Sequence, residues 1–263
     1  MLSEEKVHKY LERISFREVP ASANFDVLKR LQQQHLLKIP FENLDIHLGF
    51  PITTDIEKFF EKIVINKRGG FCYELNGIFN ELLMVIGFNT KLISARVANS
   101  EGGFGEEFDH MAIIVNIDSE EWLVDVGFGE FAQMPLKLVT GIVQKDLRGK
   151  LIVEKYDGQY FIVRKLLSDK EFENQYIFSL KERSFRDFEE MCNYHQTSPK
   201  SHFTQKKMCS IALTDGRVTL TDRNLKITKN NIVTEQEIKD DREFFEKLKL
   251  IFGIELTKGF HPS

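Results

Sequence analysis

The 263-residue sequence has few cysteines and tryptophans, and its charges nearly balance. It contains 1 Trp and 3 Cys, and its formal net charge is −4. A nucleic-acid-binding protein normally shows a basic face, so we expect no nucleic-acid partner. The cysteines Cys72, Cys192 and Cys209 form neither a disulfide framework nor a zinc-site spacing. We therefore expect no metal and a reducing, cytoplasmic location.

Long apolar runs and nucleotide-binding motifs are also missing. The longest apolar run, Leu82 to Phe88, is too short to span a bilayer, and residues 1–6 carry no signal-peptide pattern. There is no P-loop or dinucleotide fingerprint and no internal repeat. We expect no membrane partner and parts that pack on one another, while the oligomeric state stays open.

Phenylalanine is unusually abundant, with 23 residues against 6 Tyr. These side chains supply apolar volume without polar groups, which suits a large core or an aromatic-lined pocket.

The first third of the chain shows helical periodicity. Helices are predicted after Ser3, from Asn24 towards Leu37, from a Thr54–Glu57 capping box through Val64, and from Cys72 to Gly87. The segment between Phe41 and Leu44 is predicted to be irregular or extended.

From Phe88 the period changes to that of strands. Strands are predicted at 89–97, 111–117, 121–126, 151–156 and 160–166, as an antiparallel sheet or barrel. In the last third, 208–213 and 218–221 predict a hairpin with a type I′ turn at Asp215-Gly216. A capping box of Thr234 and Glu237 predicts a helix that carries Phe244 and stops at Gly253.

Cys72 is the most informative residue, because Gly69-Gly70 places it at the start of a predicted amphipathic helix. A thiol there lies near unpaired amide groups and the positive end of the helix dipole, which favour the thiolate. His110 and Asp125 supply a possible base and its orienting carboxylate.

Sequence spacing indicates that His110 and Asp125 share one face of a hairpin. If Asp118-Ser119 is a two-residue turn, Ile113 opposes Val124 and His110 opposes residue 127. Asp125 is then a diagonal neighbour of His110, about 7–8 Å away at the backbone and within side-chain reach. A change of one residue in the turn would place them on opposite faces.

These three residues together predict an acyl-transfer site. Asp125 would orient the imidazole, and the Cys72–His110 pair would lower the thiol pKa. The Cys72 amide is the natural first donor of an oxyanion hole, and the second donor is not encoded. Pattern alone leaves a structural cysteine and solvated histidine and aspartate side chains equally open.

The segment Arg68-Gly69-Gly70-Phe71-Cys72-Tyr73-Glu74-Leu75-Asn76 resembles the signature R-G-G-x-C-x-E-x-N of the arylamine N-acetyltransferases. Matching motifs follow the expected order at Pro40–Leu44, Asp109-His110 and Val124–Gly129, with a weaker echo from Asn193 to Phe203. Together they span about residues 10 to 205.

The resemblance implies an α+β fold with a cysteine-protease-like core arrangement. It implies an N-terminal helical bundle with the nucleophile (1–87), a central antiparallel β-barrel with His110 and Asp125 (88–185) and a C-terminal α/β lid (186–263). It also implies a ping-pong reaction in which acetyl-CoA acetylates Cys72. The acetyl group then passes to an arylamine, an arylhydrazine or the oxygen of an N-hydroxyarylamine.

The resemblance also assigns supporting roles. Arg68 and Glu42 resemble an ion pair beneath the site, while Glu74 and Asn76 are expected to brace the helix start. Phe128 and, more weakly, Phe203 are expected to contact the aromatic substrate.

The sequence gives little indication of which residues bind CoA. Gly102 and Gly103 are candidates to present amides to its phosphates, with Lys200, Lys206 or Lys207 as candidate partners; a loop and solvated lysines are the alternative. Cys192 and Cys209 are expected to be packing residues or surface thiols.

Three other functions stay open. A cysteine hydrolase or transglutaminase-like enzyme uses the same residue types but acts on amides without CoA, and the Arg-Gly-Gly context argues against it. An amide synthase of the same superfamily, closing an amide within a polyketide, shares the triad. A non-enzymatic protein could instead bind aromatic amines or CoA. The preferred substrate and the physiological role, xenobiotic metabolism or an endogenous amine, are not encoded.

Overall fold

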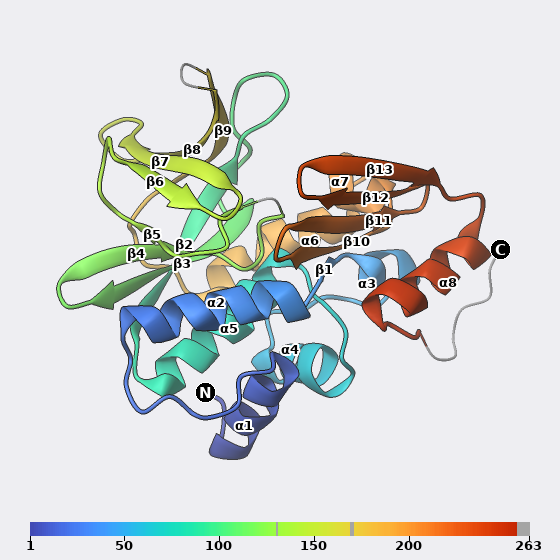
Figure 1. Ribbon diagram of the computed structural model, residues 1–263, viewed down its shortest axis with the longest axis horizontal. Helices are drawn as coiled ribbons and strands as arrows, with labels where there is room; N and C mark the ends of the chain where they lie inside the picture. Colours follow the sequence, from blue (N-terminus) through green and yellow to red (C-terminus); the bar gives the residue numbers. More distant parts are fainter. Residues whose placement is uncertain (130, 169–170, 257–263) are drawn as a thin grey trace.

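The computed structural model describes residues 1–129, 131–168 and 171–256, and it has an α+β fold (Figure 1). Helices make up the N-terminal region, and a curled eight-stranded antiparallel sheet forms the middle. A five-stranded sheet with flanking helices forms the C-terminal region. The predicted fold class is confirmed.

The N-terminal region begins with two helices whose caps the sequence predicted. The Ser3 hydroxyl accepts from the Lys6 amide (3.4 Å), and the Asn24 side chain accepts from the Val27 amide (3.0 Å). Gly87 ends the last helix with a φ of +105°, a conformation that favours glycine. The helices of this region are α1 (Glu4–Arg13), α2 (Phe25–Lys38), α3 (Leu44–Leu48), α4 (Ile56–Phe60), the π-helical η1 (Glu61–Ile65) and α5 (Cys72–Ile86).

Two details of this region differ from the prediction. The N-cap of α4 is Asp55, whose carboxylate accepts from the Glu57 amide (2.9 Å), while the Thr54 hydroxyl donates to Glu189 instead. A carboxylate is the better cap because it also meets the positive end of the helix dipole. The segment 41–44 is only partly extended, since β1 (Phe41–Glu42) runs directly into α3.

The eight-stranded sheet closes almost into a barrel. Its order is β5-β4-β3-β2-β9-β8-β7-β6. At the seam, the Gln144 side chain accepts from the Lys137 amide (2.8 Å) and donates to the Lys137 carbonyl (2.9 Å), so one side chain replaces a ladder pair between β6 and β5. The strands are β2 (Asn89–Val97), β3 (His110–Ile117), β4 (Glu120–Val124), β5 (Leu136–Lys137), β6 (Val143–Asp146), β7 (Gly149–Lys155), β8 (Phe161–Ser168) and β9 (Glu171–Phe178).

The β3–β4 hairpin has the predicted register. Ile113 pairs with Val124 and Ile117 pairs with Glu120. Asp118 and Ser119 form the two-residue turn, with φ values of 50° and 67°, as a type I′ turn requires. The register assumed for this hairpin is therefore confirmed from Ile113–Val124 to Ile117–Glu120.

The C-terminal region contains more strand than predicted. Its sheet has the order β1-β10-β11-β12-β13, so β1 from the N-terminal region forms its edge. The remaining elements are η2 (Phe185–Phe188), α6 (Glu189–Thr197), α7 (His202–Gln205), β10 (Met208–Leu213), β11 (Gly216–Thr221), β12 (Asn224–Lys229), β13 (Ile232–Glu237) and α8 (Asp241–Phe252).

Two turn and cap predictions here were wrong. Leu213 pairs with Gly216, so the hairpin turn is Thr214-Asp215, and neither residue has the positive φ of a type I′ turn. Thr234 and Glu237 lie in β13 rather than in a helix cap. The cap of α8 is Asp240, which accepts from the Glu243 amide (2.8 Å). The spacing of a capping box also fits a strand, and the sequence alone did not separate the two.

Ser119 offers a test of the hairpin turn that sets this register. Ser119→Gly removes the steric cost of a left-handed conformation, so we expect the free energy of unfolding to rise by about 1 kcal/mol. A urea unfolding curve measures this. Ser168→Gly in the extended strand β8 is the matched control, and it should lower stability. Equal losses in both variants would contradict the turn assignment.

Candidate active site

Cys72 is the first residue of α5, and the chain before it makes the helix begin there. The Phe71 amide donates to the Glu74 carboxylate at 2.7 Å, which fixes the first turn. Gly69 packs against Pro40 so closely that a Cβ would lie 2.1 Å from the Pro40 oxygen, so only glycine fits. The Cys72 amide is one of the first four N–H groups that a helix leaves without an intrahelical partner.

Asp125 is the polar centre of the site and is fully buried. Its Oδ2 lies 2.7 Å from His110 Nε2. Its Oδ1 accepts from the amides of Gly127 (2.9 Å) and Phe128 (3.1 Å). Since Asp125 engages Nε2, the imidazole keeps Nδ1 for proton exchange with a reacting group.

Asn76 connects the cysteine helix to this pair. Its amide donates to Asp125 Oδ1 (3.0 Å) and to the Met111 carbonyl (2.7 Å), and its oxygen accepts from the Val126 amide (2.9 Å). Asn76 lies four residues after Cys72, on the same face of α5. The structure thus brings together three segments that are far apart in the chain.

Tyr176, in β9, is a part of the site that the sequence analysis missed. Its hydroxyl donates to Asp125 Oδ2 at 3.2 Å, and its ring lies 5.6 Å from that of His110. Burial, reinforced by Asp125, raises the pKa of Tyr176 well above its usual value, so the hydroxyl keeps its proton. The strand β9 was not predicted, so no sequence signal placed this tyrosine beside Asp125.

The structure contradicts the expectation that the Cys72 pKa is lowered. Only 4% of Cys72 is exposed. Burial raises the thiol pKa well above its usual value, and Cys192, Asp109 and Asp125 raise it further. A hydrogen bond with the Met111 backbone is the opposing influence. The helix terminus is present as predicted, but loss of solvent outweighs it.

Phe128 and Phe203 pack on different residues of the site. The Phe128 ring is edge-on to His110, with centroids 5.2 Å apart, and it also packs on Tyr176. The Phe203 ring lies 4.5 Å from that of Phe71, the residue before Cys72. Both rings are partly buried, and both border residues next to the predicted nucleophile or base.

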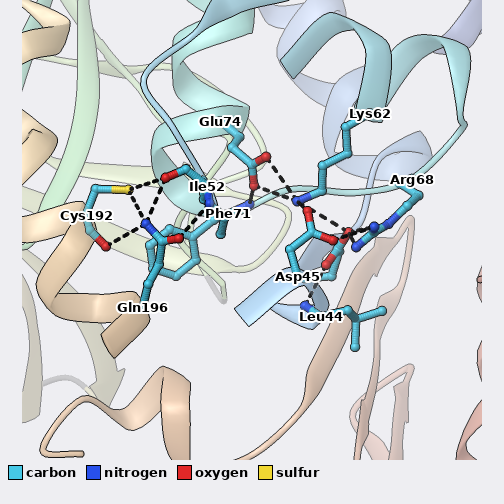
Figure 2. Close-up of polar contacts among 10 residues, drawn as sticks. Leu44, Asp45, Ile52, Lys62, Arg68, Phe71, Glu74, Cys192 and Gln196 are labelled. Atoms are coloured by element: carbon cyan, nitrogen blue, oxygen red, sulfur yellow. Dashed lines mark hydrogen bonds and ion pairs between the residues drawn. The ribbon is translucent and has the colours of Figure 1, made fainter. Parts of the chain in front are cut away.

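A buried cluster of five charged side chains supports the start of α5 (Figure 2). Arg68 donates to Glu42 (2.7 Å) and to Asp45 (2.5 Å), so the expected Arg68–Glu42 ion pair is present. Lys62 bridges Asp45 and Glu74, each at 2.8 Å. Glu74 in turn accepts the Phe71 amide, so the cluster reaches the residue before Cys72.

Electrostatics within this cluster depend on the two cations. Burial alone would raise the pKa of Asp45, but Lys62 and Arg68 outweigh it and hold that pKa below its usual value. Burial raises the pKa of Glu74 despite Lys62. Lys62 comes from the π-helical segment η1, an uncommon geometry that no sequence pattern predicted.

The structure does not favour Gly102 and Gly103 as a phosphate site. The Gly102 amide donates to the Asn99 carbonyl (3.2 Å), and the Gly103 amide donates to the Asn99 side chain (2.9 Å). Both amides therefore have partners within their own loop. Among the candidate lysines, Lys207 pairs with Asp241, while Lys200 and Lys206 are exposed.

The other two cysteines are buried. Cys192 in α6 lies beside Gln196, whose amide donates to its sulfur (3.3 Å), and Cys209 lies in β10. Within residues 1–129, 131–168 and 171–256 there is no cluster of side chains suited to a metal ion. No helix in this part of the chain is long and apolar enough to cross a membrane.

Comparison with known proteins shows which family this chain resembles. The family described as N-acetyltransferase matches residues 24–260. The chain is 33% identical to arylamine N-acetyltransferase 1 of Bos taurus and 32% identical to that of Homo sapiens, in each case over 98% of this chain and 97% of the relative.

Solved structures agree with these relatives. Arylamine N-acetyltransferase from Salmonella typhimurium superposes with a TM-score of 0.89 at 27% identity, over 99% of this chain and 96% of that one. The Mycobacterium marinum arylamine N-acetyltransferase in complex with CoA superposes with a TM-score of 0.86 at 29% identity, over 94% and 92%.

The fold and these matches define an acyltransferase enzyme. The chain belongs to the arylamine N-acetyltransferase family.

Lys62 offers a test of the charged cluster. Lys62→Met leaves three buried carboxylates with Arg68 as their cation, so we expect a loss of about 3–5 kcal/mol in the free energy of unfolding at about pH 7. The difference from wild type should shrink towards about pH 5. The unpaired, buried carboxylates of the variant take up protons there, whereas in the wild type the lowered pKa of Asp45 keeps that carboxylate ionised and paired at this pH.

Urea unfolding at both pH values measures this difference. Lys58→Met is the matched control, since Lys58 is an exposed residue of α4, and it should change stability by no more than about 0.5 kcal/mol. A pH-independent loss in Lys62→Met would show that packing, not charge, is the contribution of Lys62.

Proposed function

We propose that this protein transfers the acetyl group of acetyl-CoA to arylamines and arylhydrazines, and to the oxygen of N-hydroxyarylamines, through an acetyl-cysteine at Cys72. The observation that carries the proposal is the bond network of Asn76. It joins the face of α5 that begins with Cys72 to the His110–Asp125 pair. The named relatives and the CoA complex of a structural neighbour support the choice of substrates.

In this mechanism His110 is the base. Its Nε2–H donates to Asp125, and Asp125 is held in turn by Asn76 and Tyr176, so the imidazole orientation is fixed before substrate binds. Burial raises the pKa of the Cys72 thiol, so its attack needs a base that accepts the thiol proton. His110 Nδ1 therefore removes the thiol proton as Cys72 attacks, rather than pairing with a preformed thiolate.

The first half-reaction loads the enzyme. Cys72 Sγ forms a bond to the acetyl carbonyl carbon while its proton passes to His110 Nδ1. The Cys72 amide, free at the helix N-terminus, donates to the carbonyl oxygen as negative charge develops. The bond between that carbon and the CoA sulfur then breaks, and CoA leaves with the proton from His110.

The second half-reaction unloads it. The amine nitrogen attacks the acetyl-Cys72 carbonyl, and His110 Nδ1 accepts the proton that the nitrogen loses. The bond to Cys72 Sγ breaks, and the proton returns to the thiol. Atoms and charge balance over the cycle, and no metal is required.

Aromatic side chains at the site suit an aromatic acceptor. Phe128 lies edge-on to His110, and Phe203 packs on Phe71, so both are positioned near the groups that the acceptor must reach. A planar amine gains by stacking on such rings. We propose Phe128 as the principal substrate contact and Phe203 as a secondary one.

The proposal extends to the organisation and location of the chain. Residues 1–87 would supply the nucleophile, 88–185 the His–Asp pair, and 186–263 a lid, although β1 crosses this division by joining the C-terminal sheet. The three cysteines are free thiols, which supports a reducing cytoplasm as the working location.

Incubation with acetyl-CoA alone tests the proposal. We expect the intact protein to gain one acetyl group, measured by mass spectrometry. Cys72→Ala should abolish this gain, because it removes the proposed nucleophile. Cys192→Ala and Cys209→Ala are matched controls that should still be acetylated. CoA release with a panel of aromatic amines and hydrazines then measures turnover.

One result of the same experiment would contradict the proposal. Unmodified wild-type protein, under conditions where iodoacetamide still alkylates Cys72, would contradict acyl transfer. It would favour a protein that binds amines or CoA without turnover.

A further inference from the structure

A second His–Asp pair lies directly beside the proposed triad. His195 Nε2, in α6, is 3.2 Å from Asp109 Oδ1, and Asp109 immediately precedes His110. The Nε2 atom is buried and has no hydrogen-bond partner in the described part of the chain, so its contact with Asp109 is an ion-pair contact. The mechanism above uses neither residue.

The position of His195 is fixed by aromatic rings that border Cys72. Its ring centroid lies 5.8 Å from that of Phe71, 6.2 Å from that of Tyr73 and 5.2 Å from that of Phe203. Phe71 and Tyr73 are the two chain neighbours of Cys72. Only 5% of His195 is exposed, so the imidazole is held beside the start of α5 rather than in solvent.

The two ring nitrogens of His195 lie against different neighbours. Nδ1 lies 3.4 Å from Ser201 Oγ, whose own hydrogen is donated to the His195 carbonyl (3.0 Å). Nε2 faces the Asp109 carboxylate. Each ring nitrogen of His195 therefore lies against an oxygen atom of a residue that is itself held in place.

Asp109 is held as firmly as its partner. Its Oδ2 accepts from the Val97 amide at 3.2 Å. The preceding residue, Phe108, has a φ of +67°, a strained conformation for a bulky residue, and the Tyr73 hydroxyl donates to the Phe108 carbonyl (2.8 Å). The same hydroxyl lies 3.3 Å from the Asp109 carbonyl. Tyr73 follows Cys72, so these bonds tie the backbone of Phe108 and Asp109 to the start of α5.

Charge at this place acts on the thiol. A nearby carboxylate disfavours a thiolate, and a nearby cation favours it. The titratable groups whose charges act on Cys72 or respond to it are Asp109 and Asp125 from the β3–β4 side, Tyr73 on α5 and Cys192 from α6. His195 is the group that contacts Asp109 from α6 and can offset its charge.

We propose that His195 and Asp109 are positioning residues that set the charge beside Cys72, with His195 held against the Asp109 carboxylate and offsetting its effect on the thiol. This inference rests on the proposed role of Cys72 as the nucleophile. Neither residue touches the reacting atoms; both act through the ease with which Cys72 gives up its proton to His110.

Two single variants test the proposal because they have opposite expected effects. Asp109→Asn removes a negative charge near the thiol, so alkylation of Cys72 by iodoacetamide at about pH 7 should become about 3- to 10-fold faster. His195→Gln leaves Asp109 uncompensated, so the same reaction should become slower by a similar factor. The double variant should lie near wild type.

The measurement is the pH profile of alkylation, with Cys72 resolved from Cys192 and Cys209 by peptide mass spectrometry. His202→Gln is the matched control, an exposed histidine in α7, and it should leave the profile unchanged. Thermal unfolding identifies any variant that fails to fold. If His195→Gln does not fold, Asp109→Asn alone tests the proposal, which requires the rate of Cys72 alkylation to rise in that variant.

The outcomes separate this inference from the proposed function. Slower alkylation in both single variants, or an unchanged rate in Asp109→Asn, would show that the pair is only structural and would overturn the inference. If the opposite shifts occur but acetyl-CoA does not acetylate the wild type, the pair still tunes Cys72 and the proposed function fails. If acetylation occurs without opposite shifts, the inference alone fails.

Discussion

The hydrogen bonds that converge on the buried Asp125 carboxylate hold the rest of the site in place. A carboxylate without solvent is very costly unless donors surround it, and five donors do so here. They come from α5, β3, β9 and the loop after β4, as Asn76, His110, Tyr176 and the amides of Gly127 and Phe128. Because each segment contributes a donor, none can move without leaving the charge unsatisfied.

The start of α5 is the second constrained point, and charges fix it from two sides. On one side, Glu74 links the Phe71 amide to Lys62 and through it to the carboxylates that Arg68 binds (Figure 2). On the other, Asp109 and His195 lie against the strained turn before β3. Buried ion pairs of this kind add little net stability, so their consequence is the fixed geometry and charge around Cys72.

Local signals explain which features the sequence predicted. The hairpin register followed from a two-residue turn and strict alternation. The side chains of Ser3 and Asn24 cap the starts of α1 and α2, and Gly87 ends α5 because it adopts a positive φ. Features that depend on contacts between distant segments were not predicted. Tyr176 reaches Asp125 only because β9 pairs with β2, and Lys62 depends on a π-helical turn. The prediction of a lowered Cys72 thiol pKa was wrong in direction, because the burial that raises this pKa depends on the whole fold.

The central claim is that Cys72 carries the acetyl group while no CoA is bound. The direct test is a two-stage transfer. The protein is acetylated with acetyl-CoA, desalted to remove all CoA, and then given an aromatic amine. The account predicts that the amine is acetylated and that the protein mass returns to that of the free enzyme. Product that forms only when acetyl-CoA is still present would contradict the acetyl-cysteine intermediate.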